Sequence, residues 1–249
     1  ILRALVLVAT FVVAYVYMKD WGFTPKRSRH PLTEMRRVLR SSLDHGLGNP
    51  PVRWVMLSEL FLAGVGIYAF YAMQPYLLEL YGNEQAYSIA GLTAAIIAGA
   101  QIAGGMAAPR IRRLFRRRTS ALLASVLASS VLLALLGLTT SFWVAIGLLI
   151  VWGLIFAAAE PIRQAYMNGL IPSEQRATVL SFDNMLGSSG GVLIQPGLGK
   201  VADTWSYPAS YVVGAAIQLL AAPFVILARR QNPRSDPIDE GLTDQPVGS

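Results

Sequence analysis

The sequence lacks cysteine, contains only two histidines and carries little charge. Without cysteine, the sequence provides no disulfide, no thiol nucleophile and no thiolate ligand for a metal. The two histidines, His30 and His45, lie in one polar segment, so we expect neither a metal centre nor a cofactor. Charged residues make up 14% of the 249 residues and hydrophobic residues 54%, a composition typical of membrane proteins rather than soluble domains.

Acidic residues are scarcer than basic ones, with 14 against 21, which gives a formal net charge of +7. In a soluble protein such an excess would favour nucleic-acid binding. Here the basic residues cluster beside apolar runs. We therefore expect them to face a lipid bilayer, and we predict no nucleic-acid partner.

Long apolar runs dominate the rest of the sequence. A bilayer core of roughly 30 Å needs about 20 apolar helical residues, and backbone polar groups in lipid must be hydrogen-bonded within their own segment. The sequence therefore predicts an all-α membrane protein. The runs that qualify, or nearly do, cover about residues 1–18, 53–81, 87–109, 120–138, 142–162, 176–200 and 207–228.

The distribution of lysine and arginine predicts the orientation of these spans. If residues 19–52 are cytoplasmic and the spans alternate, only Arg3 and Lys200 fall outside the cytoplasmic side. We therefore expect a multi-pass protein of the plasma membrane whose C-terminal tail is also cytoplasmic. The chain begins inside an apolar run, without methionine or a signal-peptide cleavage site, so we expect it to be part of a larger protein.

Two polar segments flank the last six spans. Residues 32–43 place apolar side chains at helical spacing opposite arginines, which predicts an amphipathic helix on the membrane surface or a solvated linker helix. Residues 230–249 are polar and rich in proline and glycine. They cannot bury a core, which predicts a disordered tail.

A polar joint between two apolar runs, from Glu160 to Asp183, is the most unusual stretch of the sequence. Its sequence is EPIRQAYMNGLIPSEQRATVLSFD, and it spreads ionisable groups over about four helical turns. A short polar turn would suffice to join two apolar helices. Charge at membrane depth is costly and is usually functional. We therefore interpret the joint as part of a gate in a membrane transporter.

The order of the elements, one apolar helix, a long basic loop and six further spans, resembles the C-terminal half of a major facilitator superfamily transporter. Three local segments are similar to that family as well: GGMAAPRIRRLFRRR (104–118), IPSEQRATVLSF (171–182) and QPGLGKVAD (195–203). In the first of these segments, we expect the two glycines to close one helix and the last arginines to precede the next.

The resemblance implies a division of the chain and a partner for it. The N-terminal half of the transporter would be that partner. Inverted three-helix repeats would relate the seventh and tenth helices, and each carries a late proline, Pro75 and Pro161. The implied segments are 1–18 as the sixth helix, 19–52 as the cytoplasmic linker, 53–229 as a six-helix C-terminal half and 230–249 as the tail.

Members of the family carry small solutes by alternating access and are not enzymes, so the resemblance implies a secondary transporter. Clusters of opposite charge latch the inner gate of such transporters and release when it opens. We expect such a latch here, although charges that merely anchor helix ends to lipid phosphates would give the same pattern. The residues concerned are Glu160, Arg163, Arg176, Asp183, Arg116, Arg117 and Arg118.

Glu59 is another ionisable group within an apolar run. It is a possible proton site, and it could equally pair with Arg53 or extend to the cytoplasm. In the family the seventh and tenth helices line the substrate cavity, where aromatic and amide side chains would suit an amphiphilic, largely uncharged ligand. Packing between helices is the alternative role. The candidate cavity residues are Tyr68, Tyr71, Gln74, Gln101, Trp152, Phe156 and Gln195.

Three functions are compatible with these features. The leading hypothesis is efflux of a small amphiphilic compound in exchange for protons. Proton-coupled uptake of a sugar or similar nutrient is the alternative, and a non-transporting receptor or assembly subunit on the same fold is another. A membrane-embedded enzyme is not expected, because the sequence has no cysteine, no HExxH motif and no P-loop.

Overall fold

The computed structural model describes residues 2–18, 40, 43–83 and 85–238. The chain divides into two units, residues 1–37 and 38–249, and each is described by itself. The first contains α1 (Leu2–Tyr17), an apolar helix of 16 residues. Most of the surface helix predicted for 32–43 lies outside the described residues, as do residues 239–249 of the predicted tail.

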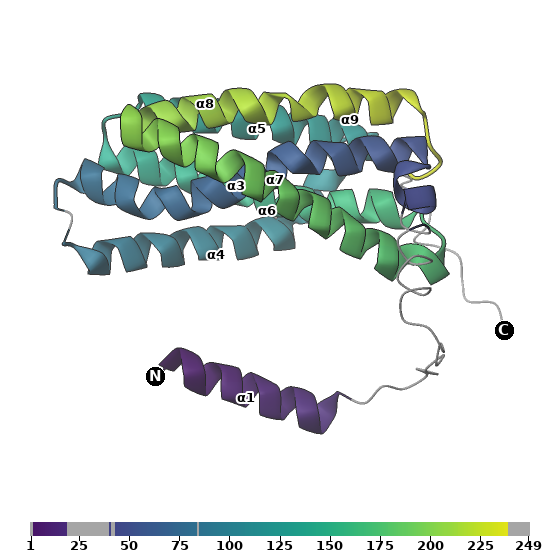
Figure 1. Ribbon diagram of the computed structural model, residues 1–249, viewed down its shortest axis with the longest axis horizontal. Coiled ribbons are helices and arrows are strands. Elements are labelled where there is room, and N and C mark those ends of the chain that lie inside the picture. Colours follow the sequence, from purple (N-terminus) through teal and green to yellow (C-terminus); the bar gives the residue numbers. More distant parts are fainter. Residues whose placement is uncertain (1, 19–39, 41–42, 84, 239–249) are drawn as a thin grey trace. The chain divides into compact units, whose positions relative to one another are not determined.

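The second unit is a bundle whose helices run roughly along one direction (Figure 1). The described part of the chain contains no β-strand. The elements of this unit, in chain order, are η1 (Leu43–Leu47), α3 (Pro50–Tyr81), α4 (Tyr87–Arg112), α5 (Arg118–Leu138), α6 (Phe142–Asn168), η2 (Ser173–Gln175), α7 (Arg176–Thr204), α8 (Tyr207–Leu219) and α9 (Ala221–Arg230).

Five stretches of the described residues are long and apolar enough to cross a membrane: α3, α4, α5, α6 and the α8–α9 pair. They confirm the predicted all-α membrane fold. The run predicted at 176–200 forms α7, which is not among these five. Its lower hydropathy follows from Asp183, Lys200 and the stretch of glycine and serine at 187–191.

The helix boundary predicted near Gly104 is wrong. α4 continues past Gly104 and Gly105, and through Pro109, to Arg112. A Cβ atom on Gly104 would collide with the carbonyl oxygen of Leu154 on α6. The glycine therefore permits a close contact between two helices and does not end one.

The polar joint is shorter than predicted. α6 continues to Asn168, beyond the expected end at 162, and therefore contains both Glu160 and Arg163. The link between α6 and α7 covers only residues 169–175. Glu160, Arg163, Arg176 and Asp183 thus lie on helices of the bundle, whereas Glu174 lies in the link.

The last predicted span, at 207–228, is divided at Leu220 into α8 and α9. Pro223 explains the division. Proline has no N–H to donate, and its ring clashes with the carbonyl group four residues earlier in a continuous helix. The two helices still form one apolar stretch from Tyr207 to Arg230.

α3 is central to the packing, because it contacts α7, α8 and α9, while α4 packs on α6 and α5 packs on α6 and α8. Glycines permit the closest of these approaches. A Cβ atom on Gly190 of α7 would collide with the carbonyl oxygen of Leu60 on α3, and one on Gly64 would lie 2.8 Å from the carbonyl oxygen of Gly190. Small residues of this kind let helix backbones approach closely in membranes.

One end of the bundle gathers most of the described arginines, and we call it the basic end. α3, α5 and α7 begin there, and α4, α6 and α9 end there, on the right in Figure 1. We predict that it faces the cytoplasm. Its arginines include Arg53, Arg110, Arg112, Arg113, Arg116, Arg117, Arg118, Arg176, Arg229, Arg230 and Arg234.

The predicted disorder of 230–249 needs correction for its first part. Residues 231–238 follow α9 and return to the basic end, where Ser235 and Asp236 are buried. Pro237 forms an isolated antiparallel bridge with Arg117. Composition predicted the wrong outcome, because hydrogen bonds and an ion pair to the bundle hold this polar segment without an apolar core of its own.

Candidate functional site

Arg163 on α6 is the centre of a buried charge cluster near the basic end. Its side chain is only 7% exposed, and its Nε atom lies 3.0 Å from Oε2 of Glu59 on α3. Nη2 donates a hydrogen bond to Oδ2 of Asp183 on α7. Nη1 lies 3.7 Å from Oε1 of Glu160, one turn earlier on α6. We call these four residues the Arg163 cluster, to which three helices contribute.

Local spacing and close helix packing together build the Arg163 cluster. Glu160 and Arg163 share a helix face because they are three residues apart. Glu59 and Asp183 meet them because α3 packs on both α7 and α6. Gly187, one turn after Asp183, contributes to this approach, since a Cβ atom there would lie 3.2 Å from Cγ of Glu59.

The cluster contains three carboxylates and one guanidinium. Asp183 is buried, and its Oδ1 atom has no hydrogen-bond partner in the described structure, although Oδ2 accepts from Arg163. The side chain of Glu160 is 47% exposed, and it also accepts a hydrogen bond of 2.8 Å from Gln164. The cluster is therefore buried at Asp183 and Arg163 and open at Glu160.

Other residues of the predicted latch lie elsewhere. Arg176 donates a 2.9 Å hydrogen bond to the carbonyl oxygen of Asn168, across the link between α6 and α7. Arg116, Arg117 and Arg118 lie beside residues 235–238 of the C-terminal segment. The side chains of Arg118 and Arg176 donate to backbone carbonyl oxygens, Arg117 pairs with the Asp236 side chain, and Arg116 accepts through its own carbonyl oxygen. By contrast, the Arg163 cluster joins helices.

Glu59 pairs with Arg163 and not with Arg53, its expected alternative partner. The guanidinium of Arg53 lies over the ring of Trp54, 4.7 Å from its centroid. Glu59, the possible proton site, therefore lies in one cluster with three residues of the predicted latch, Glu160, Arg163 and Asp183. Sequence reasoning kept them apart because Glu59 and Arg163 lie on different helices, and no local spacing connects them.

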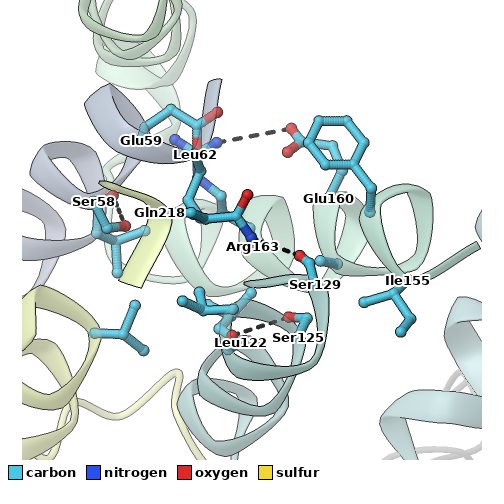
Figure 2. A pocket seen from close by; sticks show the side chains of 15 residues that line it. Ser58, Glu59, Leu62, Leu122, Ser125, Ser129, Ile155, Glu160, Arg163 and Gln218 are labelled. Atoms are coloured by element: carbon cyan, nitrogen blue, oxygen red, sulfur yellow. Dashed lines mark hydrogen bonds and ion pairs between the residues drawn. The ribbon is translucent and has the colours of Figure 1, made fainter. Parts of the chain in front are cut away.

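A small cavity of about 60 Å³ adjoins the cluster between α3, α5, α6, α8 and α9. Figure 2 shows Glu59, Glu160 and Arg163 in its wall, together with Gln218 and Ser129. Gln218 donates a 2.7 Å hydrogen bond to Ser129. The volume suits a few water molecules and is too small for a substrate.

Sequence reasoning missed the polar residues on the far wall of this cavity. Ser125 and Ser129 lie four residues apart in an apolar run, so they share one helix face. Gln218 is a lone amide in the last apolar span. The spacing of the two serines could have indicated a polar stripe on this helix face. Nothing in the sequence indicated that Ser129 pairs with Gln218.

The predicted cavity wall divides into buried and exposed residues. Tyr68 is buried and donates a 2.6 Å hydrogen bond to Ser210, and Trp152 is buried and stacks on Phe156 with centroids 5.4 Å apart. Tyr71 and Phe156 are 68% and 39% exposed. Gln74 is also exposed, whereas Gln101 and Gln195 are half-buried. Tyr68 and Trp152 thus pack inside the bundle, and the predicted roles of these residues stay predictions.

The bundle and its five long apolar stretches define a multi-pass membrane protein. The sequence pattern of the Major Facilitator Superfamily matches residues 1–195 and, in a second alignment, residues 117–248. The chain belongs to this superfamily, whose members are secondary transporters of small molecules and not enzymes. A comparison with curated proteins gives no match. The predicted resemblance is therefore confirmed.

Proposed function

We propose that the chain belongs to a transporter that exports a small amphiphilic compound in exchange for protons, with the Arg163 cluster as its charge latch. The observation that carries the proposal is the burial of one arginine against carboxylates from α3, α6 and α7. These ion pairs tie three helices together near the basic end. A change in the pair with Glu59 alters the contact of α6 with α3, and a change in the pair with Asp183 alters its contact with α7.

The composition of the cluster supports a role for protons. When all its groups are ionised, three carboxylates and one guanidinium leave two excess negative charges. Buried excess charge is costly. One proton bound by a carboxyl group halves the excess and weakens that group's attraction to Arg163. Proton binding and release of the latch are then the same event.

The exposed members of the predicted cavity wall support an amphiphilic substrate. Tyr71, Gln74 and Phe156 present two aromatic rings and one amide outside the core of the bundle. Aromatic surface with few hydrogen-bonding groups suits a ligand that is largely apolar and carries no full charge.

The test of the latch is Asp183→Asn in the membrane-inserted protein, assayed in vesicles with a neutral amphiphilic dye. This change removes one of the two excess negative charges, so we expect the thermal stability to remain close to that of the parent. We expect transport to fall by about fivefold or more, the range of a typical coupling energy between two states. Glu174→Gln, an exposed change in the α6–α7 link, is the control. Parental transport in Asp183→Asn would remove the latch.

The coupling and the direction of transport are tested separately. An imposed pH gradient should drive dye out of the cytoplasmic space, and Glu59→Gln should abolish the effect of the gradient while dye exchange at equal pH continues. Transport that ignores the gradient would overturn proton coupling and leave the latch intact. Gradient-driven accumulation of a radiolabelled sugar in the opposite direction would favour nutrient uptake instead.

A further inference from the structure

The residues that follow α9 form a close junction with the start of α5. The N–H of Arg118 donates to the carbonyl oxygen of Asp236 at 2.8 Å, and the N–H of Ile238 donates to the carbonyl oxygen of Arg116 at 3.1 Å. The Arg118 side chain donates to the carbonyl oxygens of Ser235 and Pro237. The segment is therefore docked by backbone pairing, as a short added strand would be.

The carboxylate of Asp236 caps α5 from a distant part of the chain. The local N-cap residue, Arg117, makes no capping hydrogen bond with its side chain. Oδ1 of Asp236 accepts from the N–H of Thr119 at 2.9 Å, and Oδ2 accepts from the hydroxyl of Thr119 at 3.0 Å. An acidic group at a helix N-terminus satisfies an otherwise unpaired N–H and favours the helix dipole. Asp236 is fully buried there, with Arg117 Nη1 3.9 Å from Oδ2.

The same segment also contacts the end of α6. The hydroxyl of Ser235 donates to the carbonyl oxygen of Tyr166 at 2.9 Å. Gly169, just after α6, leaves room for this contact, since a Cβ atom there would lie 2.7 Å from Cβ of Ser235. Tyr166 is one turn after Arg163, so the segment meets the helix that carries the centre of the Arg163 cluster.

We propose that the start of α5 and the end of α6 form a docking site for a short acidic segment, occupied here by the chain's own Ser235–Ile238. The docked segment acts as a clip that holds these two helix ends together. It accounts for Arg117 and Arg118 as components of this site, separate from the latch. When the segment undocks, α5 loses its cap and the end of α6 loses the contact at Tyr166. The position of Arg163 then depends on the clip. The inference stands independently of the proposed substrate and of proton coupling.

Amide hydrogen exchange of the membrane-inserted protein tests the clip. The variant is Asp236→Ala, which removes both acceptor oxygens of the cap, and Glu174→Gln is the exposed control. Asp236→Ala should speed exchange at least about fivefold, the factor expected for a lost cap. The effect should appear together at residues 117–121, 166–171 and 233–238. Glu174→Gln should leave all three regions unchanged.

Faster exchange at 117–121 alone would overturn the proposal, because Asp236 would then be a local cap and no clip. Unchanged exchange in all three regions would overturn it as well. Thr119→Val removes only the hydroxyl that donates to Asp236. It carries the same test if Asp236→Ala does not accumulate, with the same pattern expected at a smaller amplitude. Exchange that stays parental in a folded Thr119→Val protein would contradict the clip.

Discussion

The basic end of the bundle holds two charge clusters of different composition. In the Arg163 cluster one guanidinium faces three carboxylates. In the clip the carboxylate of Asp236 pairs with the guanidinium of Arg117, and the Arg118 side chain donates to backbone carbonyl oxygens beside it. The first joins side chains of three helices, whereas the second relies mainly on backbone groups of a short segment and a helix start. The two clusters therefore differ in charge balance and in what their hydrogen bonds hold.

The carboxylates of Asp183 and Asp236 differ in how their oxygens are hydrogen-bonded. Both oxygens of Asp236 accept hydrogen bonds from Thr119. By contrast, one oxygen of Asp183 is buried without a hydrogen-bond partner in the described structure. A buried carboxylate with spare acceptor capacity and excess negative charge around it can take a proton without losing every partner. A proton on Asp236 would remove its negative charge and weaken the bonds that its oxygens accept from Thr119.

The largest expected effect tests whether the Arg163 cluster is a unit. Arg163→Met leaves three carboxylates close together, two of them largely buried, without their shared cation. Breaking a buried ion pair by removing one partner costs about 3–5 kcal/mol, which thermal unfolding in detergent micelles should show as a large fall in Tm. Arg176→Met, which removes a hydrogen bond to a loop carbonyl, should change Tm much less. Equal effects of the two variants would show that the cluster carries no special stability.

A pair of glycine variants tests whether the α3–α7 contact supports the Arg163 cluster and not the clip. Gly190→Ala places a methyl group against the Leu60 carbonyl and should destabilise by about 1–3 kcal/mol, the usual cost of overpacking. Gly197→Ala, on the same helix, meets no atom within 4 Å. It should stabilise by about 0.5–1 kcal/mol through helix propensity.

The measurements for this pair are Tm and amide hydrogen exchange. Exchange should rise around Glu59 and Asp183 in Gly190→Ala and stay parental at 233–238. If exchange instead rose at 233–238 and stayed parental around Glu59 and Asp183, the α3–α7 contact would support the clip and not the Arg163 cluster. That result would contradict the comparison.

The smallest expected effect concerns the cavity wall beside the Arg163 cluster. Ser129→Ala removes the acceptor of Gln218 and should cost about 1 kcal/mol, the usual worth of a hydrogen bond. Its neighbour Ser130 is also buried, and its hydroxyl has no partner in the described structure. Ser130→Ala should therefore be neutral or slightly stabilising by Tm. Equal losses at both positions would mean that the Gln218 bond contributes nothing.

Part of the site could be predicted because it depends on local spacing. Glu160 and Arg163 were predicted to pair because they are three residues apart, and in the structure Oε1 of Glu160 lies 3.7 Å from Nη1 of Arg163. Tyr68 and Tyr71 show where such spacing fails. They are also three residues apart, yet one is buried against Ser210 and the other is exposed. Spacing defines a helix face only broadly, and the neighbouring helix decides which part of that face is covered.

The prediction for the tail failed for a related reason. Composition judges whether a segment can bury its own apolar surface. It contains no information on a docking site that offers backbone partners and arginines, as the start of α5 does for Ser235 and Asp236. The prediction that Gly104 and Gly105 end a helix failed for the same reason. A glycine suits a helix end and a close helix contact equally well, and the sequence does not show that α6 lies against Gly104.

The sequence by itself determined that this protein is a helical membrane protein and which superfamily it belongs to. Hydropathy and the need to satisfy backbone groups in lipid act segment by segment, so they can be read along the chain. Only the tertiary structure decided that Arg163 serves Glu59 as well as Asp183, and that Asp236 caps a helix 117 residues earlier. Partners of this kind depend on how closely helices approach, and that approach is set by contacts between residues far apart in the chain.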